Sequence, residues 1–175
     1  KEKTQVISEV FFLQHNRYFY FKPAHPVGLP WKDKLDDLKG LKYGSLYNFE
    51  KSPYQNAGIS VTESDVRSLL EKLQKRELDF IGVPDLVGDY WINKLYLSQK
   101  QDFVSLTANA GVQPLSIMFA KNNPRSQALH KAFLSGLNTI INNGQYLQIL
   151  EKAYGKDKIP ADFIPGLQKY RRAAQ

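Results

Sequence analysis

Two short segments carry side chains suited to binding a small polar molecule. The first is "SLYNFE", residues 45–50, and the second is "VPD", which ends at Asp85. Aromatic rings such as those of Tyr47 and Phe49 provide van der Waals contact, and carboxylates such as Glu50 and Asp85 bind an ammonium group. A structural interpretation stays open beside this one: the rings would cover a sheet edge, and Asp85 would cap the next helix.

Catalytic and nucleotide-binding motifs do not occur in the sequence. It contains no GxGxxG, P-loop, HExxH or GxSxG pattern. The three histidines, His15, His25 and His130, are far apart in the chain, and we expect each to lie at the surface. Cysteine is absent, which excludes disulfides and thiolate chemistry. We therefore expect no enzyme activity, no metal site and no cofactor.

Length and composition predict one globular domain or two small ones. The 175 residues are 42% hydrophobic and 13% aromatic, enough for a packed core. The apolar runs are shorter than the ~18 residues that a membrane span needs. The net charge is +7, but acidic and basic residues are mixed along the chain. This mixture favours a solvated basic surface, and we expect no nucleic-acid partner.

The pattern of apolar residues predicts strands alternating with helices. Val66, Leu69, Leu70 and Leu73 share one helical face, and Thr62 with Asp65 resembles a capping box for that helix. One or two strands are predicted at 10–22, where the polar "QHNR" interrupts the apolar pattern. Single strands are predicted at 41–46, 58–62, 78–85, 102–107 and 114–121. Further helices are predicted at 86–97, 123–144 and 145–155, with a proline-rich connector at 23–31. This alternation predicts an α/β fold with a mainly parallel sheet. Both binding segments then follow strand ends, where such sheets bind ligands, and face one crevice.

Three ordered segments resemble a known family. They are "LDDLKGLKYGSLYNFE", "SVTESDVRSLLEKLQKRELDFIGVPD" and "PLSIMFAKNNPRSQALHKAFLSGLNTIINNGQYLQILEKAYG". Together they resemble the extracellular solute-binding proteins of polar amino-acid ABC importers (solute-binding family 3), over nearly the whole chain. The resemblance implies a type II periplasmic-binding-protein-like α/β fold, with one complete lobe plus the C-terminal part of the other lobe.

The resemblance also implies a division of the chain. Residues 1–23 would end lobe one and enter the hinge, 24–112 would form lobe two, and 113–175 would supply the return hinge strand and the C-terminal helices of lobe one. The chain then resembles a C-terminal fragment that lacks the first half of lobe one. The apolar surface left uncovered predicts self-association of the fragment as a dimer.

The ligand contacts of the family map onto this sequence with departures. The arginine that binds the ligand carboxylate falls at Lys1, which keeps the charge without the bidentate fork. A Gly-Thr pair falls at Asn48 and Phe49. The aspartate that binds the ammonium group falls at Pro84, and Asp85 reaches it with a one-residue slip, at what we expect to be an exposed strand end. The candidate ligand-binding residues are Lys1, Leu46, Tyr47, Asn48, Phe49, Glu50 and Asp85.

The function that the resemblance implies is solute binding for an ABC importer by closure of two lobes. The ligand would be an amino acid or a related small polar molecule, the partner an ABC permease, and the location periplasmic or extracellular. The departures predict that the loop does not recognise a standard α-amino acid in the usual way. Two alternatives remain: a sensor or accessory module of a larger membrane or cell-wall protein, and a small-carboxylate dehydratase that uses Glu50 and Asp85.

Overall fold

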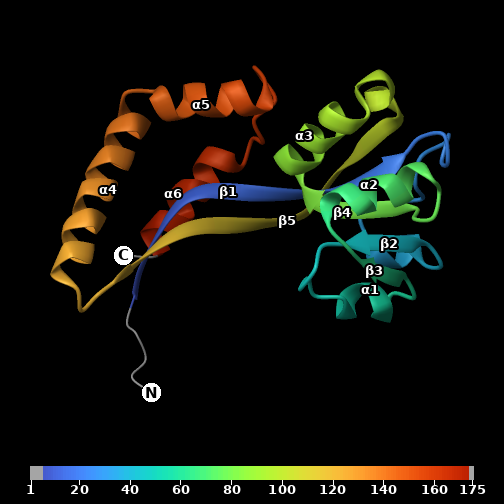
Figure 1. The fold of residues 1–175 in the computed structure, drawn as a ribbon, viewed down its shortest axis with the longest axis horizontal. Coiled ribbons are helices and arrows are strands. Elements are labelled where there is room, and N and C mark those ends of the chain that lie inside the picture. Colours follow the sequence, from blue (N-terminus) through green and yellow to red (C-terminus); the bar gives the residue numbers. More distant parts are fainter. Residues whose placement is uncertain (1–5, 174–175) are drawn as a thin grey trace. The chain divides into compact units, whose positions relative to one another are not determined.

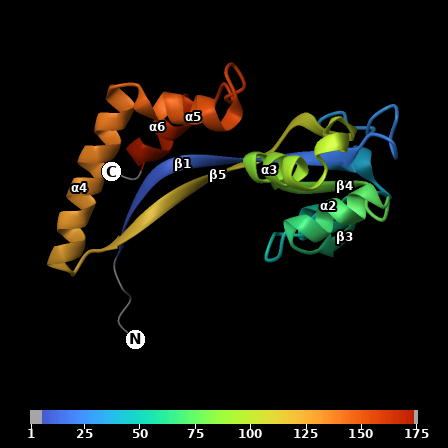
Figure 2. The same cartoon turned by 45° about the horizontal axis from the view of Figure 1, so that its top comes forward.

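The chain divides into two compact units. A computed structural model describes the backbone of residues 6–173 and the side chains of 6–106 and 110–171. Residues 15–112 form one unit, here the central unit, and the residues up to 14 and from 113 onward form the other, here the terminal unit. Strands β1 (Val6–Phe21) and β5 (Phe103–Ala120) lie side by side and contribute residues to both units (Figures 1 and 2). The assignment of these units to lobes of a larger protein remains a prediction.

The sheet is mainly parallel, as the sequence predicts. Its strand order is β3-β2-β4-β1-β5. Strands β2 (Lys42–Ser45), β3 (Ser60–Glu63) and β4 (Phe80–Pro84) run parallel to one another. Strand β1 pairs antiparallel with β4, and its Arg17 lies opposite Val83. This topology gathers the carboxyl ends of three neighbouring strands at one edge.

A helix follows each of the three parallel strands. These helices are α1 (Ser52–Asn56), α2 (Val66–Gln74) and α3 (Asp85–Leu95), with short 3-10 segments η1 (Leu35–Leu38) and η2 (Leu97–Asp102). The predicted apolar face of α2 is confirmed, but its cap differs. Asp65, not Thr62, is the N-cap, and its Oδ1 accepts a hydrogen bond of 3.0 Å from the Ser68 amide. The same serine lowers the pKa of Asp65 through its hydroxyl and amide hydrogen bonds.

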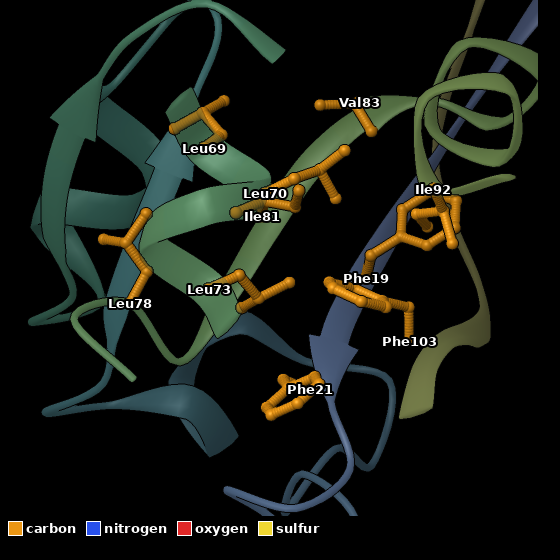
Figure 3. Packing of buried hydrophobic residues seen from close by; sticks show 10 residues of the cluster. All are labelled: Phe19, Phe21, Leu69, Leu70, Leu73, Leu78, Ile81, Val83, Ile92 and Phe103. Atoms are coloured by element: carbon orange, nitrogen blue, oxygen red, sulfur yellow. The ribbon is translucent and has the colours of Figure 1, made fainter. Parts of the chain in front are cut away.

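One apolar core of the central unit forms where α2 and α3 cover the sheet. Figure 3 shows this first apolar cluster, which consists of Phe19, Phe21, Leu69, Leu70, Leu73, Leu78, Ile81, Val83, Ile92 and Phe103. Gly44 of β2 lies against it. A Cβ atom at Gly44 would lie 2.7 Å from both Leu69 Cδ2 and Leu78 Cδ1, so a larger residue would displace these core side chains. Close packing of α2 on β2 therefore requires the glycine.

A second apolar cluster, rich in tyrosine, packs around Tyr43, the residue before Gly44 in β2. Three of its members are buried tyrosines, called the tyrosine cluster below: Tyr18, Tyr43 and Tyr54. The rings of Tyr43 and Tyr54 stack with centroids 4.2 Å apart, and the Tyr18 and Tyr54 hydroxyl oxygens are 2.9 Å apart. Burial is the main cause that raises the pKa of all three phenols well above the ordinary value. Because successive residues of a strand face opposite sides, β2 has a core on each face.

The terminal unit is built on helices α4 (Pro124–Asn142), α5 (Gln145–Tyr154) and α6 (Phe163–Ala173). Asn123 caps α4 as predicted: its Oδ1 accepts hydrogen bonds from the amides of Arg125 and Ser126. Gly144, at φ 81°, separates α4 from α5. The sequence did not predict α6. No described helix has the length and apolar character needed to cross a membrane.

Strand β5 is continuous, whereas the sequence predicts separate strands at 102–107 and 114–121. The residues between them include Gly111 and precede Pro114, which usually interrupt a strand. Because β5 is an edge strand of the sheet, it belongs to the class of strands that tolerate a proline such as Pro114. The neighbouring β1 is itself one continuous strand.

The expectation that all three histidines lie at the surface is wrong. The whole residue His15 is only 4% exposed. His25 and His130 are half-buried, with Nε2 of His25 3.1 Å from Asp79 Oδ1 and Nε2 of His130 2.8 Å from Glu9 Oε1. In the second pair the partners are 121 residues apart in the sequence, so local helical periodicity could not reveal the contact.

Candidate functional site

The structure brings the two candidate segments to the same edge of the central unit. Ser45, the last residue of β2, lies opposite Glu63 of β3 and Gly82 of β4. The residues that follow these parallel strands, together with the adjoining part of β1, are called the carboxyl edge below. They comprise residues 45–51, 63–65 and 84–86, and residues 15–17 of β1, where Asn16 is paired with Pro84.

The loop after β2 contains two anchored residues and three accessible ones. Leu46 packs against the first apolar cluster and Phe49 against the second. Tyr47 is 62% exposed, and Asn48 and Glu50 are also exposed. Asn48 has φ 64°, a left-handed conformation that asparagine tolerates better than most residues. The predicted aromatic pair therefore has two different roles: Phe49 fixes the loop, and Tyr47 is accessible to a ligand.

Polar contacts brace the loop against the rest of the edge. Lys51 Nζ lies 2.5 Å from Glu63 Oε2, which joins the end of the loop to the end of β3. The Ser64 amide donates a hydrogen bond of 3.0 Å to the Ser45 carbonyl. Glu50 accepts a hydrogen bond from the Ser52 hydroxyl at 3.0 Å. These contacts give the loop a defined position beside the sheet.

Asp85 is buried, which corrects the expectation of an exposed strand end. The residue is 4% exposed and occupies the first position of α3. Its Oδ1 accepts a hydrogen bond of 2.7 Å from the Leu86 amide, and its Oδ2 lies 3.8 Å from Nε of Arg17. A carboxylate at this end of a helix is favoured by the helix dipole. Asp85 thus helps to start α3 and also pairs with a cation from β1.

Buried polar residues gather at the carboxyl edge. Among the described residues of the central unit, the buried polar or charged ones are His15, Asn16, Ser45, Ser64 and Asp85. All five belong to the carboxyl edge. Burial of polar groups costs free energy unless partners compensate, so natural folds concentrate them where a function requires them. This concentration marks the edge as the candidate site.

Residues 15–17 of β1 belong to the site although the sequence did not nominate them. The signal was present: "QHNR", residues 14–17, is a polar interruption in a strand otherwise rich in apolar residues. What the sequence could not supply was the antiparallel register that sets Arg17 opposite Val83, two residues before Asp85. Lys1, the candidate for the carboxylate contact, lies outside the described residues. Pro84 is buried and precedes α3 as its N-cap.

A surface pocket of about 320 Å³ lies on α2 and α3. Its lining residues are Arg67, Glu71, Gln74, Lys75, Leu95 and Tyr96, which include no residue of the carboxyl edge. Within it Lys75 donates a hydrogen bond of 2.6 Å to Glu71, and this contact lowers the pKa of the Glu71 carboxyl. Two charged residues of this pocket, Glu71 and Lys75, therefore already pair with each other.

Comparisons with known proteins identify the fold. No family model matches the sequence, and no curated protein matches it either. Solved structures do match. An ancestral arginine-binding protein bound to arginine superposes with a TM-score of 0.64 at 20% identity, over 86% of this chain and 65% of that one. An arginine transport-system periplasmic binding protein from Legionella pneumophila gives a TM-score of 0.60 at 18% identity, over 85% and 65% of the two chains.

The fold is that of periplasmic binding proteins. A histidine kinase sensor domain similar to periplasmic binding proteins also matches, with a TM-score of 0.58 at 18% identity, over 86% of this chain and 68% of that one. The chain spans about two thirds of the length of these proteins. The periplasmic-binding-protein-like fold expected from the resemblance is thus confirmed, and it accounts for a mainly parallel sheet whose carboxyl edge carries the candidate site.

Proposed function

We propose that this chain binds a small polar solute at the carboxyl edge of the central unit. The observation that carries the proposal is the gathering of five buried polar residues at this edge, beside a braced loop with an accessible aromatic ring. Ligands of open α/β sheets bind at the carboxyl ends of the strands. An accessible ring and a mixed set of charged and neutral polar groups suit a small molecule with both polar and apolar parts.

The wider role we propose is that of a solute-binding component of an ABC importer, located in the periplasm or outside the cell. Several structures with this fold are described as binding proteins of transport systems or amino-acid ABC transporters. Transport would then involve closure of two lobes around the solute and docking on a permease. An amino acid is one candidate ligand, because neighbours with the fold hold arginine or glutamine.

Binding, not catalysis, is the activity we propose. The two carboxylates considered for a dehydratase are in unequal settings: Glu50 is exposed and accepts a hydrogen bond from Ser52, whereas Asp85 is buried beside Arg17. Nothing in these contacts couples one as an acid to the other as a base. Loss of a measured dehydratase turnover in the double variant Glu50→Gln, Asp85→Asn would contradict this proposal.

A sensor or accessory module is the second candidate, because one structural neighbour is a histidine kinase sensor domain. Both roles use solute binding, so the binding site does not distinguish them. The coding sequence that surrounds these 175 residues does. A membrane-spanning helix followed by a kinase or cell-wall enzyme domain would support the sensor or accessory role, and a free binding protein with a secretion signal would support the importer role.

Isothermal titration calorimetry tests the binding proposal. The chain would be titrated with a panel of polar amino acids, small amines and small carboxylates. We expect saturable heat with at least one solute, and a weaker affinity in Asp85→Asn. The matched control is Glu71→Gln, which removes one carboxylate outside the carboxyl edge. A folded protein that binds nothing in the panel, or an equal loss of affinity in both variants, would refute the proposed site.

A further inference from the structure

Arg17 brings a permanent positive charge to the carboxyl edge. Its side chain is 38% exposed, whereas the side chain of its partner Asp85 is 6% exposed. The guanidinium group carries a full positive charge and offers only hydrogen-bond donors. The cation is therefore accessible from solvent at a place where the surrounding polar residues are buried.

The contact with Asp85 uses only a part of the hydrogen-bonding capacity of Arg17. Its Nε lies 3.8 Å from Asp85 Oδ2, a distance that allows charge attraction but exceeds that of a hydrogen bond. Among the residues that the structure describes, this is the polar contact that Arg17 makes. A guanidinium carries five N–H donors in a planar fork, so its two Nη groups remain available to an incoming acceptor.

The surroundings favour a singly charged anion. Asp85 starts α3, and the amides in the first turn of a helix carry a partial positive charge. Asn16 and Ser45, also at this edge, are neutral and buried. The carboxylate of Asp85 repels an incoming anion, and it repels a dianion such as hydrogen phosphate more strongly than a singly charged carboxylate. A carboxylate also matches the fork of the guanidinium.

We propose that Arg17 is the carboxylate-binding group of this site, with Asp85 as the residue that positions its guanidinium. The proposal rests on the proposed function and narrows it: the solute carries a carboxylate, and the central unit itself binds that group. The resemblance assigned this task to Lys1, which lacks the fork. The guanidinium of Arg17 offers the bidentate geometry from a different strand.

Nitrogen-15 NMR of the chain reads the proposed contact directly through the Nε–Hε resonance of Arg17. Four probes are titrated separately: L-glutamine, glutaramic acid (which lacks the ammonium group), 4-aminobutanamide (which lacks the carboxylate) and inorganic phosphate. We expect the Arg17 resonance to shift with L-glutamine and glutaramic acid, and to stay in place with the other two. An equal shift with 4-aminobutanamide, a larger one with phosphate, or no shift with any probe overturns the assignment.

Substitution gives a second readout. Arg17→Gln should weaken the binding of glutaramic acid about ten- to a hundredfold, as expected for loss of a charge-assisted hydrogen bond in a binding site. Arg17→Lys keeps the charge beside Asp85 and protects the fold, and should show an intermediate loss because the fork is gone. The control Arg67→Gln removes an arginine of the separate pocket on α2.

The outcomes separate this proposal from the broader one. Unchanged affinity for glutaramic acid in both Arg17 variants overturns the role of Arg17. If calorimetry has at the same time found a solute that binds, the proposed solute-binding function stands and only its carboxylate contact is wrong. If calorimetry finds no solute that binds, the proposed solute-binding function is refuted, and the role of Arg17 is refuted with it.

Discussion

Replacement of Asp85 by alanine should destabilise the central unit, contrary to what an exposed strand end would predict. The variant loses the hydrogen bond of 2.7 Å to the Leu86 amide and the negative charge at the start of α3. A hydrogen bond to a charged group contributes about 1.5–3 kcal/mol, and a charge at a helix end about 0.3–1 kcal/mol. The ion pair with Arg17, which is 38% exposed, adds at most about 1 kcal/mol after solvent screening.

The expected loss is therefore about 2–4 kcal/mol in the free energy of unfolding. Asp85→Asn keeps an acceptor oxygen for the Leu86 amide and loses only the charge, so its loss should be about 1–2 kcal/mol. Urea unfolding followed by tryptophan fluorescence measures both, because Trp91 of α3 packs against the first apolar cluster. A change below about 0.5 kcal/mol in the alanine variant would show that these contacts do not support the fold.

Three further perturbations test the packing, the tyrosine cluster and the exposed surface. Gly44→Ala should lower the free energy of urea unfolding by about 1–3 kcal/mol, because its Cβ would lie 2.7 Å from atoms of Leu69 and Leu78. The control is Gly136→Ala in α4, whose added Cβ would have no neighbouring atom within 4 Å and which should not destabilise the protein. Burial raises the phenol pKa values of the tyrosine cluster above 10.0. As the pH rises, the unfolded chain therefore loses these protons before the folded chain does. The free energy of unfolding should be unaffected below pH 10 and should fall above it by about 1.4 kcal/mol per pH unit for each tyrosine. A free energy of unfolding that stays constant above pH 10 would contradict the burial of these hydroxyls. Apolar side chains of β5 between residues 115 and 118 are exposed, Met118 by 71%. Because an exposed apolar edge strand favours association, light scattering at micromolar concentration should show a dimer. A monomer at all concentrations would contradict self-association.

The sequence predicted best those elements whose signal is local. The helix from Val66 to Gln74 shows an apolar face at helical spacing, and Asn123 with Pro124 marks the start of α4 by residue type alone. Helix α6 was missed because Pro165 and Gly166 usually break helices. In the structure Pro165 lies in the first turn of α6, where its missing amide hydrogen costs no intrahelical bond.

The candidate site was predicted only in part, because its remaining members depend on strand register. The loop at 46–50 and Asp85 each follow a strand, so their shared edge could be inferred from strand order alone. Arg17 could be added only with knowledge that β1 runs antiparallel to β4. The burial of His15 likewise follows from tertiary contacts. A single sequence gives little information on side chains that come together through the pairing of distant strands. Here the only local signal is the polar interruption of an apolar strand.

The most direct test of a solute site at the carboxyl edge is a backbone amide NMR titration with the tightest solute from the calorimetric panel. If the site is correct, the largest shifts fall on residues 46–50 and on Asp85 and Leu86. If the largest shifts fall instead around Arg67 and Tyr96, the pocket on α2 and α3 is the binding site and the assignment of the carboxyl edge is wrong.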